Sequence, residues 1–129
     1  MAVQYMHTKK IAHRDIRLQT LFVQTDQKTD ISINVVSLGQ AKLFDEKGYT
    51  NELPSNYANM DSIAGVHRNP AFFRAPETFK LGRQHGMKVD EYAVGVLAYL
   101  FLIGDGQHYP FDISDNNALD DLKIYNQLD

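Results

Sequence analysis

The sequence predicts an α+β fold that is mainly α-helical and contains one small β-hairpin. Residues 88–103 are apolar almost throughout, which is typical of a helix at the centre of its fold. Residues 21–36 contain two apolar runs separated by a polar turn, the usual pattern of a β-hairpin. Residues 1–8 place Val3 and Met6 on one helical face. At 129 residues, the chain is long enough for one small domain with its own core.

Composition argues against several classes of function. A net charge of -3 offers no basic excess for binding nucleic acid. No apolar run reaches the roughly 20 residues that a membrane-spanning helix needs, and no apolar leader follows the N-terminus. There is no cysteine for a disulfide or a thiolate metal site, and the five histidines lack the spacing of metal ligands. We therefore expect a cytoplasmic, intracellular protein that binds neither nucleic acid nor membrane.

The first half of the chain predicts a helix, a hairpin and a long loop. The helical pattern of residues 1–8 begins on the first residue without a capping residue, so we expect a helix that lacks its front half. Residues 21–23 predict a short buried strand, and residues 31–36 predict its partner. Residues 44–70 are mostly polar, and a loop of this length is uncommon in a compact domain unless it is functional or disordered.

Two helices are expected in the second half. The stronger one, residues 88–103, carries Asp90 in its first turn, where an acidic side chain favours the helix dipole and can act as a cap. The sequence Gly-Asp-Gly at residues 104–106 ends this helix. Residues 118–128 predict a last amphipathic helix.

The tripeptide HRD at residues 13–15 places three titratable side chains at a polar turn between a helix and a strand, where catalytic loops commonly lie. Taken alone, it also fits a solvated surface turn. Three motifs follow it in order: SLG at residues 37–39, APE at residues 75–77 and KVDEYAVGVL at residues 88–97. Together these motifs resemble the C-terminal lobe of the protein kinases over nearly the whole chain.

The resemblance implies roles for five residues. Asp15 stands in the place of the base that accepts the substrate hydroxyl's proton, and Arg17 in that of the residue that steadies the transferred phosphate. Thr20 replaces an asparagine ligand of magnesium, and Ser37 replaces the aspartate that holds the metal ion. Since hard cations prefer anionic oxygen, we expect no metal site. Phe22 replaces an aliphatic residue beneath the adenine ring and would crowd a nucleotide.

Other parts of the family pattern are absent from the sequence. There is no glycine-rich phosphate loop, no strand lysine and no glutamate partner for it, so the resemblance implies that the N-terminal lobe is missing. Residues 1–129 are thus predicted to be a partial kinase-like domain, with a catalytic loop at 13–23, an activation segment at 37–77 and a central helix at 88–103. In the family, the residue at the position of Asp90 holds the backbone of the catalytic loop.

Two functions remain as hypotheses. The first is a catalytically impaired homologue, a pseudokinase, that acts by contact with protein partners and uses no cofactor. The second is part of an active kinase that uses Mg-ATP to phosphorylate Ser/Thr or Tyr of protein substrates, with the missing N-terminal lobe as its partner. Arg17 and Pro70 favour the tyrosine pattern, whereas YPF at residues 109–111 and the long loop favour the serine/threonine pattern. In either case the resemblance implies that Arg14 would pair with a phosphate group attached to a hydroxyl in the long loop. The alternative is that these hydroxyls are ordinary residues of a polar loop.

Overall fold

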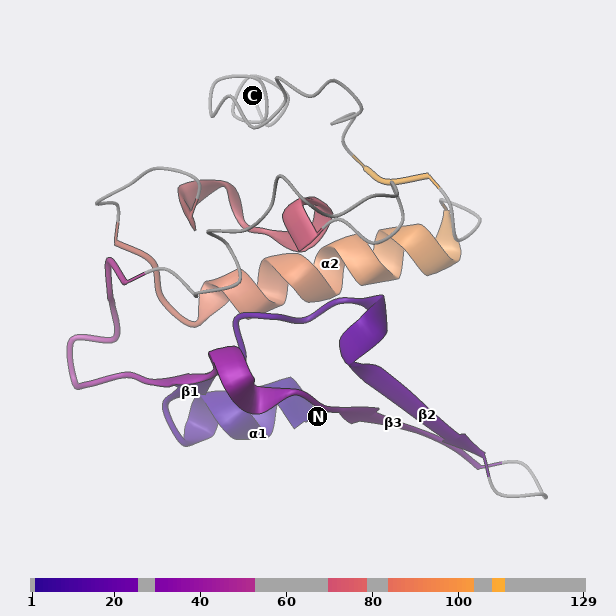
Figure 1. The fold of residues 1–129 in the computed structure, drawn as a ribbon, viewed down its shortest axis with the longest axis horizontal. Helices are drawn as coiled ribbons and strands as arrows, with labels where there is room; N and C mark the ends of the chain where they lie inside the picture. The colour runs from indigo at the N-terminus through magenta and orange to yellow at the C-terminus, as the bar shows by residue number, and fades with distance from the viewer. Residues whose placement is uncertain (1, 26–29, 53–69, 79–83, 104–107, 111–129) are drawn as a thin grey trace.

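The computed structural model describes residues 2–25, 30–52, 70–78, 84–103 and 108–110 (Figure 1). The elements in this part of the chain are, in order, α1 (Ala2–Thr8), β1 (Ile11–Ala12), β2 (Leu21–Thr25), β3 (Ile31–Val35), β4 (Lys42–Leu43) and α2 (Lys88–Leu102). Single 3-10 turns at Leu18–Thr20, Leu38–Gln40, Pro70–Phe73 and Pro76–Thr78 lie between them. None of the helices in the described ranges is long and apolar enough to cross a membrane.

Two short antiparallel sheets hold the first half of the chain together. The pair β2–β3 forms the predicted hairpin, with Leu21 opposite Val35 at its base and Thr25 opposite Ile31 at its far end. The pair β1–β4 joins residues far apart in sequence, with Ile11 opposite Leu43. The sequence did not predict this second pair, because two-residue strands are too short to show an alternating pattern.

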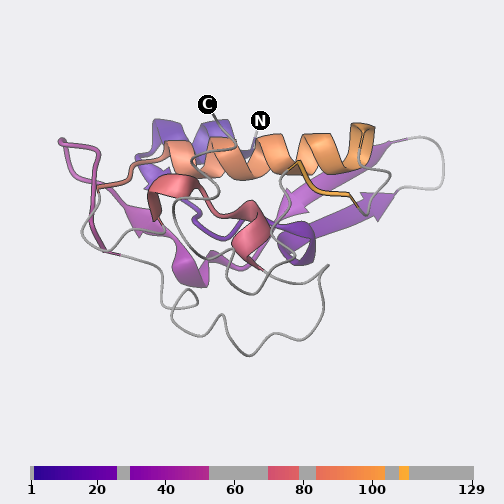
Figure 2. The same cartoon turned by 90° about the horizontal axis from the view of Figure 1, so that it is seen from above.

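The core forms around α2. In Figure 1 this helix runs between the 3-10 turns of residues 70–78 and the loop that follows β1, and α1 lies beyond that loop. Figure 2 shows the same elements from above. The buried cluster consists of Ile16, Phe73, Ala93, Val96, Leu97 and Leu100. Four of its six members belong to α2, so the prediction of a central apolar helix is confirmed.

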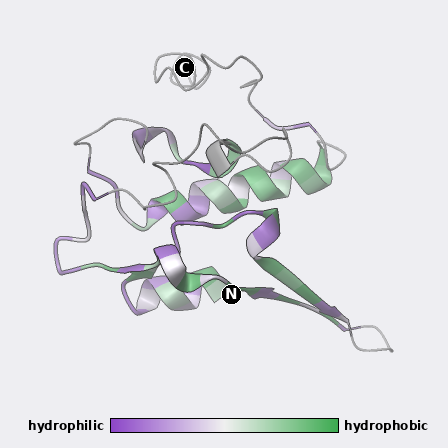
Figure 3. Ribbon diagram, in the orientation of Figure 1, coloured by the Kyte–Doolittle hydropathy of each residue, from purple (hydrophilic) through white to green (hydrophobic). Residues whose placement is uncertain are grey.

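The hairpin projects away from this core (Figure 1). Leu21 and Val35 at its base pack against the core cluster, but Phe22 is 60% exposed and Val23 is also exposed. The prediction of a buried strand at residues 21–23 is therefore wrong beyond its first residue. Figure 3 shows that the inner part of β2 and the second half of α2 are nevertheless hydrophobic.

The predicted fold class, a mainly α-helical fold of the C-terminal-lobe type, is also wrong. The described residues contain two α-helices, of 7 and 15 residues, together with two small antiparallel sheets and several 3-10 turns. Hydrophobic periodicity reveals long elements well, but 3-10 turns and two-residue strands carry no such signal. The last predicted helix, residues 118–128, and most of the predicted long loop lie outside the described residues.

Candidate functional site

The loop of residues 13–17 lies across the first turns of α2, where a carboxylate holds its backbone. Asp90, in the first turn of α2, is 1% exposed. Its Oδ2 accepts the amide N–H of His13 at 2.7 Å, and its Oδ1 accepts that of Arg14 at 2.8 Å. The role that the family resemblance gave to Asp90 is thus confirmed. Its side chain makes no cap hydrogen bond, since Met87 is the N-cap residue of α2.

His13 ties the same loop to the end of the hairpin. Its ring is fully buried, with Nε2 3.0 Å from the carbonyl oxygen of Val36. The other ring nitrogen, Nδ1, accepts the amide N–H of Asp15 at 3.2 Å. These contacts require the tautomer with its proton on Nε2, so the ring orients the backbone of Asp15 from one side and the segment before Ser37 from the other.

Arg14 connects the loop to the segment that follows Ser37. Its backbone is left-handed, with a φ of 61°, and its side chain is buried. Nε donates to the carbonyl oxygen of Gln40 at 2.8 Å, and Nη1 donates to that of Glu52 at 2.9 Å. Lys42 pairs with the carboxylate of Glu52 beside this contact. Arg14 therefore acts as a cross-link between two segments that lie about 26 and 38 residues further along the chain.

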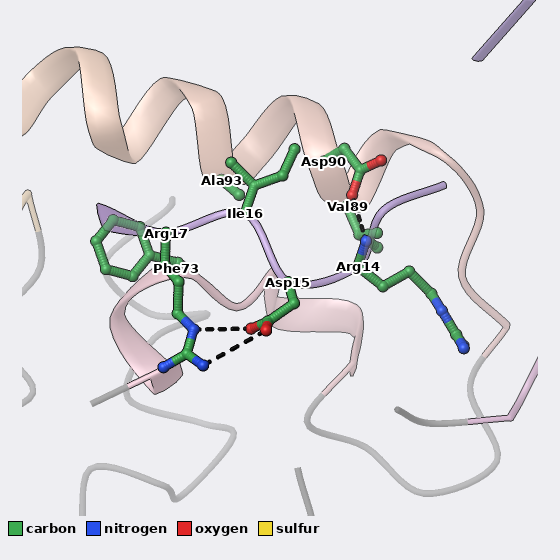
Figure 4. Close-up of a pocket in the computed structure, with 8 residues that line it drawn as sticks. All are labelled: Arg14, Asp15, Ile16, Arg17, Phe73, Val89, Asp90 and Ala93. Carbon is green, nitrogen blue, oxygen red and sulfur yellow. Dashed lines mark hydrogen bonds and ion pairs between the residues drawn. The ribbon is translucent and has the colours of Figure 1, made fainter. Parts of the chain in front are cut away.

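Asp15 and Arg17 form an ion pair (Figure 4). Arg17 Nε lies 2.9 Å from Asp15 Oδ1, and Nη2 lies 3.4 Å from Oδ2. A cavity of about 10 Å³, enough for about one water molecule, lies beside the pair. Its lining consists of Arg14, Asp15, Ile16, Arg17, Phe73, Val89, Asp90 and Ala93.

The Thr20 side chain stabilises the 3-10 turn at Leu18–Thr20 that follows the ion pair. Its hydroxyl accepts the amide N–H of Arg17 at 3.0 Å and lies 2.8 Å from the carbonyl oxygen of Asp15 and 2.9 Å from that of Arg17. One hydroxyl proton serves one of these carbonyls at a time. The side chain is 98% buried within its own loop, so its oxygen already has the partners that it needs.

Ser37 and Phe22 lie apart from this network. Ser37 has a left-handed backbone, with φ 73° and ψ 61°, and no cap hydrogen bond from its side chain. Phe22 faces solvent on β2. Among the described residues, no hydrogen bond or ion pair joins either side chain to Asp15, Arg17 or Thr20. The structure thus brings together three of the five predicted site residues.

Comparison with known sequences identifies the family. Residues 1–127 match the sequence model described as protein kinase domain. The chain belongs to the protein kinase family. A serine/threonine-protein kinase of Caenorhabditis elegans, zyg-8, is 31% identical over 120 residues, which cover 92% of this chain and 13% of that protein. An aurora kinase of Debaryomyces hansenii is 30% identical over 118 residues, 92% of this chain and 24% of that protein.

A third relative is the CBL-interacting protein kinase 25 of Oryza sativa, which is 31% identical over 103 residues, 80% of this chain and 17% of that protein. All of these relatives are much longer than the chain, which spans less than a quarter of the length of each. Among them, zyg-8 carries the serine/threonine description in its name.

Magnesium does not fit the residues that the described part of this kinase-family chain offers around the loop of residues 13–20. Magnesium needs anionic oxygen in a near-octahedral arrangement. The Thr20 hydroxyl is engaged by its own loop, the carboxylate of Asp15 faces Arg17, and Ser37 offers only a neutral hydroxyl. The described part of the chain contains no group of three His, Cys, Asp or Glu residues that could hold a metal ion.

Two residues of this region were missed by sequence reasoning. His7, in α1, lies with Nε2 2.9 Å from Asp90 Oδ2, and its place four residues after Val3, on the same helical face, is a signal that could have revealed it. His85 is 2% exposed, and neither ring nitrogen has a hydrogen-bond partner among the described residues. Burial, followed by the positive charge of Arg14, lowers the pKa of His85 to about 4.

Proposed function

We propose that this chain is part of a protein kinase domain that has lost catalytic competence and acts through contact with other proteins. The observation that carries the proposal is the hydrogen bonding of Thr20. Its hydroxyl is shared between the backbone of Arg17 and that of Asp15, so it is a poor candidate for a metal ligand. Ser37, which replaces the second expected ligand, carries no negative charge.

The proposal gives the site residues structural roles in place of chemical ones. Asp15 and Arg17 stand at the positions of the base and the phosphate anchor, and Thr20, Phe22 and Ser37 at positions that contact nucleotide or metal in the family. The catalytic loop (13–23), the activation segment (37–77) and the central helix (88–103) then form a scaffold. The contacts of Asp90 with this loop need neither metal nor nucleotide.

Protein contact is the activity that remains for such a scaffold. The hairpin carries exposed apolar residues on a surface that projects from the core, as protein-binding surfaces do. The Oryza sativa relative is named a CBL-interacting protein kinase. A cytoplasmic location, favoured by the absence of cysteine, belongs to the same proposal.

A second candidate is part of an active serine/threonine kinase that uses Mg-ATP. The observation that favours it is the intact anchoring of the loop, since Asp90 holds the backbone of His13 and Arg14 with two short hydrogen bonds. The names of the relatives, all kinases, agree with it. The two candidates differ in whether the loop region binds a divalent cation.

Binding of Mn²⁺, a paramagnetic substitute for Mg²⁺, separates them. Electron paramagnetic resonance of the 129-residue chain with Mn²⁺ and ATP should show no bound metal beyond that held by ATP alone. The double variant Thr20→Asn, Ser37→Asp restores an amide and a carboxylate and should bind Mn²⁺ measurably. Thr20→Ser, which keeps the hydroxyl, is the matched control and should behave like the unaltered chain. Measurable Mn²⁺ binding by the unaltered chain, as strong as that of the double variant, would favour the active kinase.

A further inference from the structure

The geometry points to Arg17 as a built-in counter-ion that closes over Asp15 and keeps divalent cations away from its carboxylate. Arg17 Nε and Nη2 approach the two carboxylate oxygens at 2.9 and 3.4 Å. The side chain of Asp15 is 6% exposed and that of Arg17 is 23% exposed. The inference rests on the proposed function, since it concerns the same loop, but the ion pair can be tested without any nucleotide.

The backbone of the loop explains why these two side chains meet. Arg17 is extended, with φ -162° and ψ 172°. In extended chain, side chains two residues apart point the same way and the one between them points the other way. Figure 4 shows this arrangement, with Ile16 directed at α2 and the side chains of Asp15 and Arg17 directed away from it. Burial of Ile16 in the core therefore fixes both partners of the ion pair on the opposite side of the loop.

The Thr20 hydroxyl holds the backbone of Arg17 in place. It accepts the Arg17 amide N–H, and the carbonyl oxygen of Arg17 lies 2.9 Å from the same hydroxyl. The Arg17 amide is thereby fixed and its carbonyl lies beside the same hydroxyl, so the backbone of Arg17 needs to lose less freedom when the side chain pairs with Asp15. Preorganisation of this kind strengthens a contact without adding a new one.

Charge balance makes the pair necessary. A nearly buried carboxylate is costly unless a cation or several hydrogen-bond donors compensate it. Among the described residues, the ion pair with Arg17 compensates the charge of the Asp15 side chain. The amide N–H of Asp15 donates to His13 Nδ1 and makes no contribution to this charge balance. A divalent cation that binds both oxygens of the carboxylate would have to displace the guanidinium, which contacts each of them.

The test is a double-mutant cycle on the 129-residue chain in the absence of cations and nucleotide. Asp15→Asn removes the negative charge with little change of shape, and Arg17→Met removes the guanidinium while it keeps an unbranched apolar stem. Two independent substitutions would multiply their effects on the unfolding equilibrium constant. If the residues are paired, the equilibrium constant of the double variant should be smaller than this product by at least about threefold. Urea unfolding monitored by circular dichroism measures all four proteins. Independent effects of the two substitutions would overturn the pairing.

The second arm adds MgCl2 at up to about 100 mM and compares it with NaCl of equal ionic strength, because a single carboxylate binds Mg²⁺ weakly. Arg17→Met should gain stability from Mg²⁺, because Asp15 is then uncovered, whereas the unaltered chain and the double variant should not. Lys88→Met removes a positive charge at the exposed start of α2 and controls for general charge effects. The inference would be overturned if Mg²⁺ raised the free energy of unfolding of the unaltered chain as much as that of Arg17→Met. Since the cycle is measured without metal, it can fail while the proposed loss of metal binding stands.

If Arg17→Met does not fold, nuclear magnetic resonance of the Arg17 Nη2 hydrogens, which donate to Asp15 Oδ2, gives the same information. A signal that is protected from solvent exchange in the unaltered chain and loses this protection in Asp15→Asn supports the ion pair. Equal exchange in both proteins contradicts it.

Discussion

His7 Nε2 lies 2.9 Å from Oδ2 of Asp90, so the end of α1 and the first turn of α2 meet at one buried carboxylate. The same carboxylate accepts the amides of His13 and Arg14. Two helices and the loop that carries Asp15 therefore share a single acceptor group. Because three donors converge on it, this carboxylate should be among the least replaceable groups of the described structure.

Substitution of Asp90 should destabilise the chain strongly. Asp90→Ala leaves the amides of His13 and Arg14 buried without an acceptor, and a lost charged acceptor of this kind costs about 3–5 kcal/mol. Asp90→Asn keeps one accepting oxygen and should cost less. Chemical denaturation followed by circular dichroism measures both. Glu91→Gln, at the exposed next position of α2, is the control and should change stability by less than about 0.5 kcal/mol. A loss from Asp90→Ala no greater than that of the control would contradict the shared-acceptor role.

The contacts of Asp90 also show where sequence reasoning succeeds and where it stops. The helices α1 and α2 and the hairpin β2–β3 were predicted because each carries its periodicity in one continuous stretch. The pairing of His7 with Asp90 spans 83 residues and leaves no local pattern. Family resemblance supplied the role of Asp90 toward the loop, but it did not supply the histidine.

The site itself was predictable to the same extent. Asp15, Arg17 and Thr20 lie within residues 15–20, so their proximity in space follows from their proximity in sequence. The ion pair between Asp15 and Arg17 does not, because it depends on an extended backbone at Arg17 and on the burial of Ile16 between them. The exposure of Phe22 was equally hidden, since an apolar run does not reveal that a hairpin projects beyond its core.

Acid should weaken the fold through His85. Its folded pKa of about 4 lies below the ordinary histidine value of about 6.5, so between these two pH values the unfolded chain binds more protons than the folded one. The free energy of unfolding should therefore fall as the pH falls from about 6.5 to 4, by at most about 3 kcal/mol, because each pKa unit corresponds to about 1.4 kcal/mol.

Substitution of this histidine isolates its contribution. His85→Gln cannot titrate, so the difference in unfolding free energy between the unaltered chain and the variant should change across this pH range, to the disadvantage of the unaltered chain at low pH. Urea denaturation at a series of pH values measures the difference. A constant difference from pH 7 to 4 would show that the buried ring does not set the acid sensitivity.

Replacement of Ser37 by glycine should leave the stability of the chain unchanged or raise it. At φ 73° a side chain strains the backbone, and Ser37→Gly removes this strain while it increases the freedom of the unfolded chain. The expected result is a change between neutral and about 1 kcal/mol of added stability. Ser32→Gly, the same substitution at an exposed site in β3 with ordinary backbone, should instead lose about 0.5–1 kcal/mol. Thermal unfolding compares the two. Equal losses at both sites would indicate that Ser37 is not strained.

The burial of α2 along one face predicts opposite outcomes for two leucines of the same helix. Leu100 is 0% exposed and belongs to the core cluster, whereas Leu102 is 83% exposed. Leu100→Ala should cost about 2–5 kcal/mol, because it removes buried methyl groups and leaves a cavity. Leu102→Ala should change stability by less than about 0.5 kcal/mol in the 129-residue chain. Urea denaturation of both variants tests this directly. A substantial loss from Leu102→Ala would mean that the exposed end of α2 is covered by another segment or by a second molecule, and a gel-filtration profile of the unaltered chain at several concentrations would distinguish these two cases.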